Sequence, residues 1–223
     1  MNFDDVAADY ARLHLQRPAQ GYAVYPSLFR AIGRIDGKSA LDLACGTGIV
    51  TRALRKLGAA HVVGVDSSQK MLEIAKGTTD PDSQIEYWRG IVGELGVEGS
   101  FDVITGAYAL CYSPVFPRLQ AAAHDIRTNL APGGVFIGID HTKFAGADGT
   151  ALPWSLTDDL STISGVNYFW RRETYETVMR EEGLTLEWLP ITPTDEGMRE
   201  YGAHFWREAL SGNRFSLRRC TKI

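Results

Sequence analysis

The first part of the chain shows apolar positions at the spacing of a helix. They recur in this way across residues 3–14, and Asp4 and Asp5 near the start of the segment favour the helix dipole. A second helix is expected over residues 27–35, directly after Pro26, because proline is well tolerated in a first helical turn. The pattern therefore predicts two helices before the first strand.

From residue 39 onward, short apolar runs alternate with segments of helical length. The runs predict strands at residues 39–44, 61–66, 85–88, 101–105 and 135–140. The segments between them predict helices at residues 49–57, 68–76 and 115–130. Strands separated by helices are typical of a parallel sheet built from βαβ units.

The last third of the chain breaks this alternation. Strands are predicted at residues 184–189 and 215–221, and helices at residues 173–182 and 201–210. Two closing strands without a full crossover between them indicate an antiparallel pair at one edge of the sheet. The preceding segment, residues 141–170, is long, poorly periodic and rich in Gly, Trp, Ser and Thr, so we expect a loop that serves as a lid or a specificity insert.

Composition and charge disfavour several classes of protein. The 223 residues are 44% hydrophobic and carry 23 Lys and Arg against 27 Asp and Glu, a net charge of −4. The chain shows no basic stripe of the kind that nucleic-acid binders carry, and no apolar stretch long enough for a membrane span. The acidic start is unlike a signal peptide, and three scattered cysteines without CxxC spacing indicate a reducing compartment. We therefore expect a cytoplasmic protein that binds neither nucleic acid nor membrane.

The segment Ala40-Leu-Asp-Leu-Ala-Cys-Gly-Thr-Gly48 carries the strongest chemical signal. It predicts a strand that ends in a tight glycine turn at a helix N-terminus, where a ligand can approach the backbone. Asp66 ends the next strand, 20 residues after Gly46, and a carboxylate there can accept both hydroxyls of a ribose. A ligand that contains a nucleoside is therefore expected at the carboxyl ends of these two strands.

Two kinds of nucleotide site fit this turn to different degrees. A dinucleotide site favours G-x-G-x-x-G/A, whereas the order here is Gly46-Thr-Gly48-Ile-Val-Thr51, which lacks the third small residue. Asp42 would also lie badly beside a pyrophosphate, but it would suit a ligand that carries an ammonium group. A nicotinamide-dependent dehydrogenase is therefore the disfavoured enzymatic alternative.

Taken together, these motifs resemble those of the class I S-adenosylmethionine-dependent methyltransferases. The segments that carry the resemblance are residues 41–48, 63–68, 90, 101–104 and 130–134. The likeness covers residues 38–140. It implies an α/β, Rossmann-like fold whose mostly parallel seven-stranded sheet has the order 3-2-1-4-5-7-6, with helices on both faces and an antiparallel last strand.

The resemblance also implies a role for individual residues in binding S-adenosylmethionine. The turn of Gly46, Thr47 and Gly48 would run under the methionine part. Asp42 would lie near its ammonium group, and Asp66 would hold the ribose. The other expected cofactor contacts are Tyr10, Ala44, Ser67, Met71, Gly90, Ile91, Val92 and Ala107.

One position departs from the family's pattern. Where the family often has an acid that accepts a hydrogen bond from the adenine amino group, this chain has Ile91. We therefore expect adenine to be held by apolar contact and by the backbone amide of Val92, with weaker discrimination.

Methyl transfer depends mainly on positioning a nucleophile in line with the methyl group, so a base is needed only for some acceptors. His141, directly after the fifth strand, and Tyr108, after the fourth, are the candidate catalytic residues. Each of them is equally compatible with a role in packing. Cys45 and Cys111 are expected to be small buried side chains, and the histidines show no metal-ligand spacing, so we expect no metal site.

Aromatic residues concentrate in the segments that cap the cofactor edge in this fold, where they would form a small apolar pocket for a planar substrate. The candidate substrate contacts are Tyr22, Tyr25, Tyr112, Trp154 and Trp170. Arg17, Arg171 and Arg172 could bind an acidic group of this substrate, or they could be solvated surface charges.

These observations predict a single methyltransferase domain over residues 1–223. Its expected parts are an N-terminal helical cap (1–36), a cofactor-binding core (38–140), a substrate-capping insert (141–172) and a C-terminal helix with the closing strands (173–223). The expected reaction is methyl transfer from S-adenosylmethionine to N or O of a small aromatic or heteroaromatic metabolite, chiefly by proximity and orientation, in a monomer or homodimer.

The segment Tyr201-Gly-Ala-His-Phe-Trp206, with the N-terminal helices, resembles small-molecule methyltransferases of the toxoflavin-biosynthesis type. A catalytically silent methyltransferase-like partner protein is the non-enzymatic alternative. Intact Asp42, Gly46, Gly48 and Asp66 argue against it, although they indicate cofactor binding rather than turnover.

Overall fold

The computed structural model describes residues 2–95, 99–141 and 146–223. The strands are β1 Ser39–Leu43, β2 His61–Asp66, β3 Ile85–Arg89, β4 Phe101–Ala107, β5 Leu130–His141, β6 Thr150–Thr157, β7 Thr162–Phe169, β8 Glu187–Leu189 and β9 Phe215–Thr221. The α-helices are α1 Ala7–Leu15, α2 Tyr25–Ile32, α3 Ile49–Lys56, α4 Gln69–Gly77, α5 Phe116–Asn129, α6 Arg172–Glu181 and α7 Asp195–Ala209. Short helical turns lie at η1 Phe3–Asp5, η2 Gln20–Val24, η3 Leu110–Tyr112 and η4 Ser211–Asn213.

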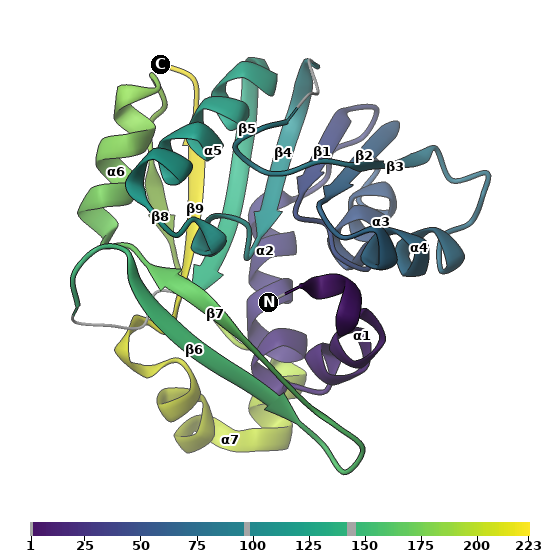
Figure 1. Cartoon of the computed structure of the whole chain (residues 1–223), viewed down its shortest axis with the longest axis vertical. Helices are drawn as coiled ribbons and strands as arrows, with labels where there is room; N and C mark the ends of the chain where they lie inside the picture. The colour runs from purple at the N-terminus through teal and green to yellow at the C-terminus, as the bar shows by residue number, and fades with distance from the viewer. Residues whose placement is uncertain (1, 96–98, 142–145) are drawn as a thin grey trace.

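Seven of the strands form one sheet in the order β3-β2-β1-β4-β5-β9-β8 (Figure 1). Strands β1 to β5 run parallel, and β9 is antiparallel to both β5 and β8. Strands β6 and β7 pair only with each other, in a separate antiparallel hairpin. When the strands of the large sheet are counted alone, its order is the predicted 3-2-1-4-5-7-6, with an antiparallel closing strand.

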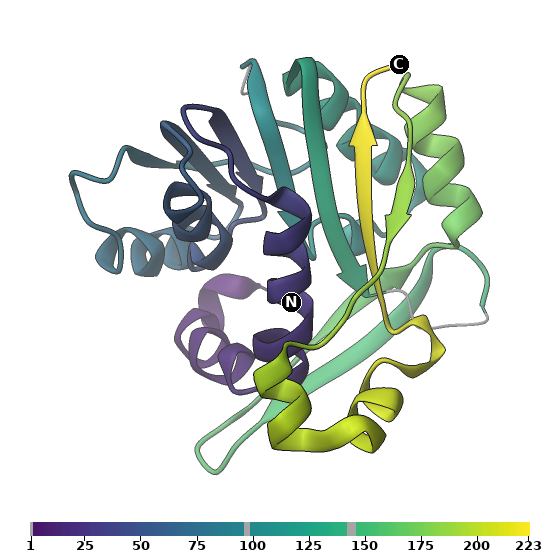
Figure 2. The same ribbon diagram turned by 180° about the vertical axis from the view of Figure 1, so that it is seen from behind.

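Helices cover both faces of the sheet, and β1 shows why. Leu41 and Leu43 point to the face covered by α5 and α6, where they join a core cluster that includes Tyr175. Ala40 points to the opposite face, where it packs in a cluster with Leu28 of α2 and residues of α3. Figure 2 shows α2 lying against this second face. Because side chains alternate along a strand, Asp42 is directed to the same side as Ala40, beneath α3.

The carboxyl ends of the parallel strands are covered by elements from both ends of the chain. The N-terminal helix α1, the β6–β7 hairpin and α7 lie together at this edge (Figure 1). The N-terminal segment is fastened there because the Asp4 carboxylate accepts hydrogen bonds from Ser68 Oγ at 2.6 Å and from the Lys70 amide at 3.0 Å. Among the described residues, no helix has both the length and the apolar character that crossing a bilayer would require.

Several helices and strands differ in type or in bounds from the elements that the sequence predicted. The segment 141–170, expected to be an irregular loop, contains the two paired eight-residue strands β6 and β7, so that expectation was wrong; residues 142–145 lie outside the described residues. The second helix was predicted from Ser27, but α2 begins at Tyr25 and continues a π-helical turn. The last helix begins at Asp195 because Thr194 caps it by accepting a hydrogen bond from the Gly197 amide.

The closing strand predicted over 184–189 is shorter than expected. It pairs with β9 only over Glu187–Leu189, and Leu184 makes a single isolated bridge to Lys222. The rest of the predicted strand is therefore a connection between α6 and the sheet edge.

Candidate functional site

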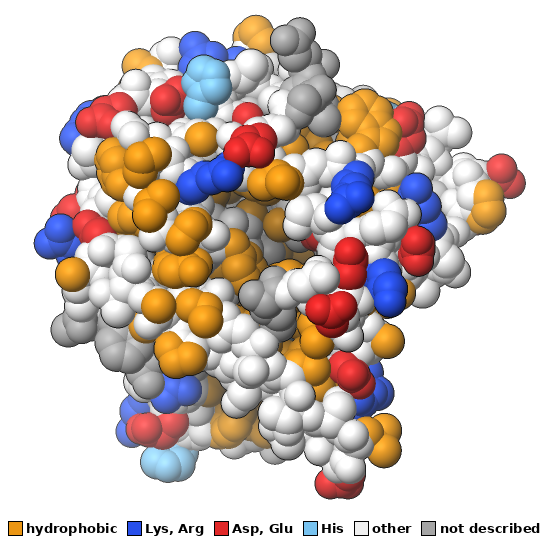
Figure 3. All heavy atoms as spheres, viewed as in Figure 1, with side chains coloured by type: hydrophobic (Ala, Val, Ile, Leu, Met, Phe, Trp, Pro, Cys, Tyr) orange, Lys and Arg blue, Asp and Glu red, His pale blue; other side chains and the backbone are white. Residues whose placement is uncertain are grey.

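A cavity of about 410 Å³ opens at the carboxyl ends of β1, β2 and β4. Hydrophobic side chains gather around the hollow on this face of the molecule (Figure 3). The expected cofactor contacts that line it are Tyr10, Ala44, Gly46, Asp66, Ser67, Met71, Gly90, Ile91, Val92 and Ala107. We call this space the cofactor cavity. Asp42 and Thr47 line a smaller space of about 40 Å³ directly beside it.

Asp66 lies at the end of β2 and ties two backbone turns together. One carboxylate oxygen accepts from the Gly46 amide at 2.8 Å, and the other accepts from the Ser68 amide at 2.9 Å. Burial raises the pKa of this carboxyl, while the backbone hydrogen bonds oppose the rise. Each carboxylate oxygen has acceptor capacity left, so Asp66 can bind a pair of hydroxyls without losing its contacts to the turn.

Asp42 lies beneath the turn and is almost completely buried. Its oxygens accept hydrogen bonds from Thr51 Oγ1 at 2.6 Å and from Thr105 Oγ1 at 2.8 Å. Burial raises its pKa to about 6, although both threonine hydroxyls favour the charged form. Among the described residues no cation pairs with it. A buried carboxylate of this kind favours a positively charged ligand group in the space beside it.

The glycine turn begins α3 in a conformation that other residues adopt poorly. Gly48 is the N-cap of α3 with φ +79°, in the left-handed region. A Cβ at Gly48 would lie 2.4 Å from Tyr87 Oη, so the approach of Tyr87 also requires glycine there. Gly48 is not among the residues that line the cavities, and the structure gives it a role in shaping the turn.

The far end of the cofactor cavity is bordered by Met71 and residues 90–92. The Ile91 side chain is 51% exposed and lies at the rim of the cavity. The loop that follows is fixed by Asp125 of α5, whose carboxylate accepts from the Gly93 amide at 2.6 Å and from the Leu95 amide at 3.2 Å.

A second cavity of about 290 Å³ adjoins the first and is lined by residues of α1, the segment 108–112 after β4, β5 and the hairpin. Tyr10, Tyr108 and Tyr112 line both spaces, so they mark the junction between them. Trp154 lines the second cavity, and its ring Nε1 donates to Asn167 Oδ1 at 3.1 Å, which fixes the indole against the hairpin. We call this second space the acceptor cavity.

The two candidate catalytic residues meet in this second space. The ring of Tyr108 stacks on that of His141, with their centroids 4.7 Å apart. Tyr108 has φ +62°, an unusual backbone conformation for a tyrosine, and its amide donates to the Ile139 carbonyl at 2.6 Å. Burial lowers the pKa of His141 to about 4 and raises that of Tyr108, so both are neutral at neutral pH. The structure brings the pair together, and their catalytic role stays a prediction.

Some expected substrate contacts lie elsewhere. Tyr22 packs against Tyr201 of α7, with ring centroids 5.6 Å apart, and lines neither cavity. Trp170 is buried beside η3, where its Nε1 donates to the Ser113 carbonyl at 3.0 Å. Tyr25 lies beside the smaller space and hydrogen-bonds to His14 Nε2 at 2.7 Å. Both Tyr22 and Trp170 are explained by packing, so the structure does not support them as substrate contacts.

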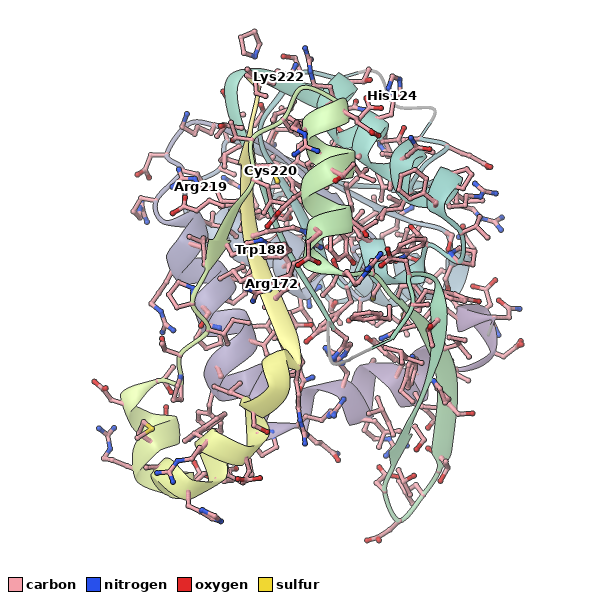
Figure 4. All side chains as sticks on the ribbon, turned by 90° about the vertical axis from the view of Figure 1, so that its left-hand side faces the viewer. His124, Arg172, Trp188, Arg219, Cys220 and Lys222 are labelled. Atoms are coloured by element: carbon pink, nitrogen blue, oxygen red, sulfur yellow. The ribbon has the colours of Figure 1, made fainter. Side chains whose placement is uncertain are left out.

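Three arginines were candidates for binding an acidic group of the substrate, and two of them interact with other residues outside the cofactor and acceptor cavities. Arg171 forms an ion pair with Asp148 at 3.0 Å. The Arg172 guanidinium lies 4.8 Å from the centre of the Trp188 ring, at the sheet edge shown in Figure 4. Arg17 alone of the three lines the acceptor cavity.

Several residues of the site were missed in the sequence. Thr51 was seen only as a poor fit to a glycine position, whereas it holds the Asp42 carboxylate. Phe3 and Arg118 line the cofactor cavity, and His14 lines the acceptor cavity with its ring stacked on Tyr10 at 4.9 Å. The helical spacing of Tyr10 and His14 was the one available signal, since residues four apart lie on the same helix face.

Comparisons with known proteins agree with this geometry. Residues 40–134 match the family model of a methyltransferase domain. Demethylmenaquinone methyltransferase of Lactococcus lactis is 32% identical over 144 residues, which are 62% of this chain and 56% of that protein. An uncharacterised protein of Haemophilus influenzae is 37% identical over 107 residues, 45% of this chain and 42% of that protein. The chain spans about half the length of these curated relatives.

Solved structures share the fold over nearly the whole chain. An S-adenosylmethionine-dependent methyltransferase from Mesorhizobium loti superposes with a TM-score of 0.71 at 24% identity, covering 90% of this chain and 98% of that one. A DhpI-SAM-HEP complex superposes with a TM-score of 0.72 at 21% identity, covering 98% and 94%. The fold that the resemblance implied is therefore confirmed, and the part of the chain that carries β1 to β4 matches a methyltransferase domain.

Proposed function

We propose that this chain binds S-adenosylmethionine in the cofactor cavity and transfers its methyl group to N or O of a small aromatic or heteroaromatic acceptor. The observation that carries the proposal is the junction between the two cavities. Tyr10, Tyr108 and Tyr112 line both, so a ligand in one cavity would meet a ligand in the other at these rings. The name of the relative demethylmenaquinone methyltransferase also suggests a small-molecule acceptor.

The residues of the first cavity fit the cofactor that the family uses. Asp66 has acceptor capacity for the two ribose hydroxyls, and the buried Asp42 carboxylate suits an ammonium group close to the glycine turn. Met71 and Ile91 offer apolar surface to a flat adenine ring. S-adenosylmethionine, when bound, supplies an electrophilic methyl group on a sulfonium.

The chain's own contribution is to position the acceptor and to exclude water from it. Phe3 packs edge-on against both Tyr10 and Tyr112, with ring centroids 5.5 Å apart in each pair, so the N-terminal segment closes over the junction. Fixing two reactants in this way can supply much of the rate of a displacement reaction. We propose that the N-terminal cap (1–36) and the insert (141–172) serve this enclosure within one domain.

His141 is proposed as the base for acceptors that lose a proton. It lines the acceptor cavity, and its ring is held between those of Tyr108 and Phe215, with centroids 4.7 and 5.0 Å away. The neutral imidazole leaves one ring nitrogen able to accept a proton. Tyr108 is proposed to position the acceptor ring, because its high pKa keeps the phenol neutral.

The volume of the acceptor cavity, about 290 Å³, and the net charge of −4 favour a small acceptor over a nucleic acid. The first experiment is a calorimetric titration with S-adenosylmethionine, S-adenosylhomocysteine and NAD. We expect both sulfur nucleosides to bind and NAD not to bind. A preference for NAD would contradict the proposal.

The second experiment measures transfer of a labelled methyl group to hydroxyl- and amino-substituted aromatic rings, each paired with its saturated-ring counterpart. We expect transfer to members of the aromatic set only. The variant His141→Gln should lower kcat about 10²-fold or more for a phenolic acceptor and leave S-adenosylhomocysteine binding unchanged. The matched control His61→Gln, at the exposed start of β2, should behave like the wild type. Equal turnover of saturated acceptors would contradict the aromatic assignment.

A further inference from the structure

Arg17 occupies a distinctive place among the walls of the acceptor cavity. Of the residues that line this cavity, it alone carries a fixed charge, and no Asp or Glu lies among them. The other walls are aromatic, aliphatic or neutral polar, with Tyr10, Tyr112 and Trp154 offering flat faces. The protein thus places one positive charge in a largely aromatic space.

That charge has no acidic partner among the described residues. Arg12 of α1, five residues before Arg17, pairs with both Asp9 and Asp158, so these two acids are already engaged. No ion pair of Arg17 occurs in the part of the chain that the structure describes. The contrast with Arg171, which pairs with Asp148, shows what a structural arginine does in this fold.

The positive charge of Arg17 also acts on the neighbouring walls. It contributes to the lowered pKa of His14 and of His141, and it opposes the raised pKa of Tyr10 and of Tyr108. The pKa of both histidines is about 4, so at neutral pH they add no charge that would change this balance. Arg17 is therefore the one fixed charge among the residues that line this cavity, while Asp66 of the adjoining cofactor cavity acts on Tyr10 with the opposite sign.

The position of Arg17 relative to the cavities indicates how a bound acceptor would be oriented. Tyr10, Tyr108 and Tyr112 are shared with the cofactor cavity, whereas Arg17 and His141 are shared with a third, more open cavity of about 690 Å³. Of these two, His141 reaches back to the junction, because its ring stacks on that of Tyr108. Arg17 thus lies at the end of the acceptor cavity away from the cofactor. A bound ring would extend from the junction toward this guanidinium.

We infer that the acceptor is a small aromatic or heteroaromatic acid whose carboxylate pairs with Arg17, on the opposite side of the ring from the atom that receives the methyl group. This inference rests on the proposed function and narrows its substrate class. A guanidinium binds a planar carboxylate through two parallel hydrogen bonds, which would fix the orientation of the ring as well as its affinity.

Binding is the primary test, because it does not depend on turnover. Protein saturated with S-adenosylhomocysteine is titrated with 4-hydroxybenzoate and with its neutral isostere 4-hydroxybenzamide, and the 4-amino and pyridine analogues are tested as further acid–amide pairs. We expect at least one acid to bind about tenfold more tightly than its amide, as a charge-assisted contact predicts. The variant Arg17→Ala should abolish this preference, and Arg17→Lys should restore part of it.

Arg171→Ala is the matched control, since it removes an exposed arginine whose partner lies outside the cavity; its preference should equal that of the wild type. An acid preference that persists in Arg17→Ala would overturn the inference, as would the absence of any acid preference in the wild type. Binding of S-adenosylhomocysteine is measured in every variant. If labelled methyl groups are transferred to neutral rings as readily as to acids, the inference is overturned and the proposed function stands. If neither S-adenosylmethionine nor S-adenosylhomocysteine binds, the proposed function itself is overturned.

Discussion

Thr51 donates a 2.6 Å hydrogen bond from its hydroxyl to the buried carboxylate of Asp42, and so links the third residue of α3 to the end of β1. Thr51, which made a dinucleotide site a poor fit to the sequence, therefore holds the Asp42 carboxylate in place beneath the glycine turn. Since both groups are buried, the loss of this bond leaves an acceptor with fewer partners in a place that water reaches poorly.

The variant Thr51→Val tests this link. It keeps the shape of the side chain and removes the donor, so we expect a loss of about 1–3 kcal/mol in the free energy of unfolding and weaker binding of S-adenosylhomocysteine. Chemical denaturation and calorimetry measure the two effects. Thr51→Ser keeps the hydroxyl and serves as the control. Equal values for Thr51→Val and the wild type would show that the bond contributes nothing.

Cofactor affinity should depend on pH through Asp42. Its pKa is raised to about 6, so the carboxyl is protonated below that pH and negatively charged above it. Only the charged form attracts an ammonium group, and we therefore expect the affinity for S-adenosylmethionine to fall as the pH drops from 8 through 6 to 5. Calorimetry across this range gives the profile. Asp42→Asn should bind weakly with a much flatter profile, and an identical pH dependence in that variant would assign the effect to another group.

The exposed Ile91 at the rim of the cofactor cavity gives a third prediction. If adenine is held there by apolar contact and by the Val92 amide, an acid at this position adds a hydrogen-bond acceptor for the adenine amino group. Ile91→Asp should therefore bind S-adenosylmethionine at least as tightly as the wild type, with better discrimination against the inosine analogue. Ile91→Asn controls for the loss of the apolar side chain. Weaker binding by Ile91→Asp would refute this account of adenine recognition.

Replacing Gly48 would destabilise the fold in two ways, through its positive φ and through the close approach of Tyr87 Oη. The two contributions to the free energy of unfolding can be measured separately. Gly48→Ala should destabilise the fold by more than 1 kcal/mol, because the new Cβ would meet Tyr87 Oη as well as the unfavourable backbone angle. Gly212→Ala changes a glycine in the same left-handed region, with φ +64° and ψ +27°, that has no atom within 4 Å of the new Cβ, so it reports the backbone cost alone. Thermal unfolding compares the two variants. A loss of stability in Gly48→Ala no larger than that in Gly212→Ala would contradict the steric argument.

Asp140 and Arg218 form a fully buried ion pair between β5 and β9. The Arg218 guanidinium lies 4.2 Å from the centre of the Tyr175 ring, and Asp140 also accepts from the Cys111 amide at 3.0 Å. Arg218→Met leaves a buried carboxylate without its cation and should cost about 3–5 kcal/mol of stability in urea denaturation. The double variant Asp140→Asn/Arg218→Met should recover much of that loss, and no recovery would show that the arginine acts mainly through packing.

The cofactor half of the site could be predicted because its signals are local in the sequence. Gly46, Gly48 and Asp66 lie on two consecutive strand–turn–helix units, and the backbone of such units is set by short-range geometry. Periodicity also located β1 to β5 and the closing strand β9. These elements determine the sheet order, so the fold class followed from them.

The acceptor half could not be predicted in the same detail because it is built from distant segments. Asp4 fastens the N-terminus to Ser68, and Arg12 donates to Ser161 across 149 residues, contacts that no local pattern contains. The hairpin was missed because Pro153 and Gly165 interrupt its alternation. For Tyr22 and Trp170 the structure shows packing contacts outside the two cavities, and an aromatic residue in a capping segment can serve packing alone.

The pairing of Arg218 with Asp140 also bears on the order in which the protein is made. Asp140 directly precedes His141 and holds the amide of Cys111 in η3, next to Tyr112, so this wall depends on an arginine from the last strand. Strand β9 lies between β5 and β8, so until residues 215–221 have left the ribosome β8 has no neighbouring strand and β5 pairs only with β4. A nascent chain would therefore carry the whole glycine turn well before it could hold an acceptor. The walls of the acceptor cavity would therefore be complete only when β9 is inserted, because Arg218 lies 78 residues after its partner Asp140.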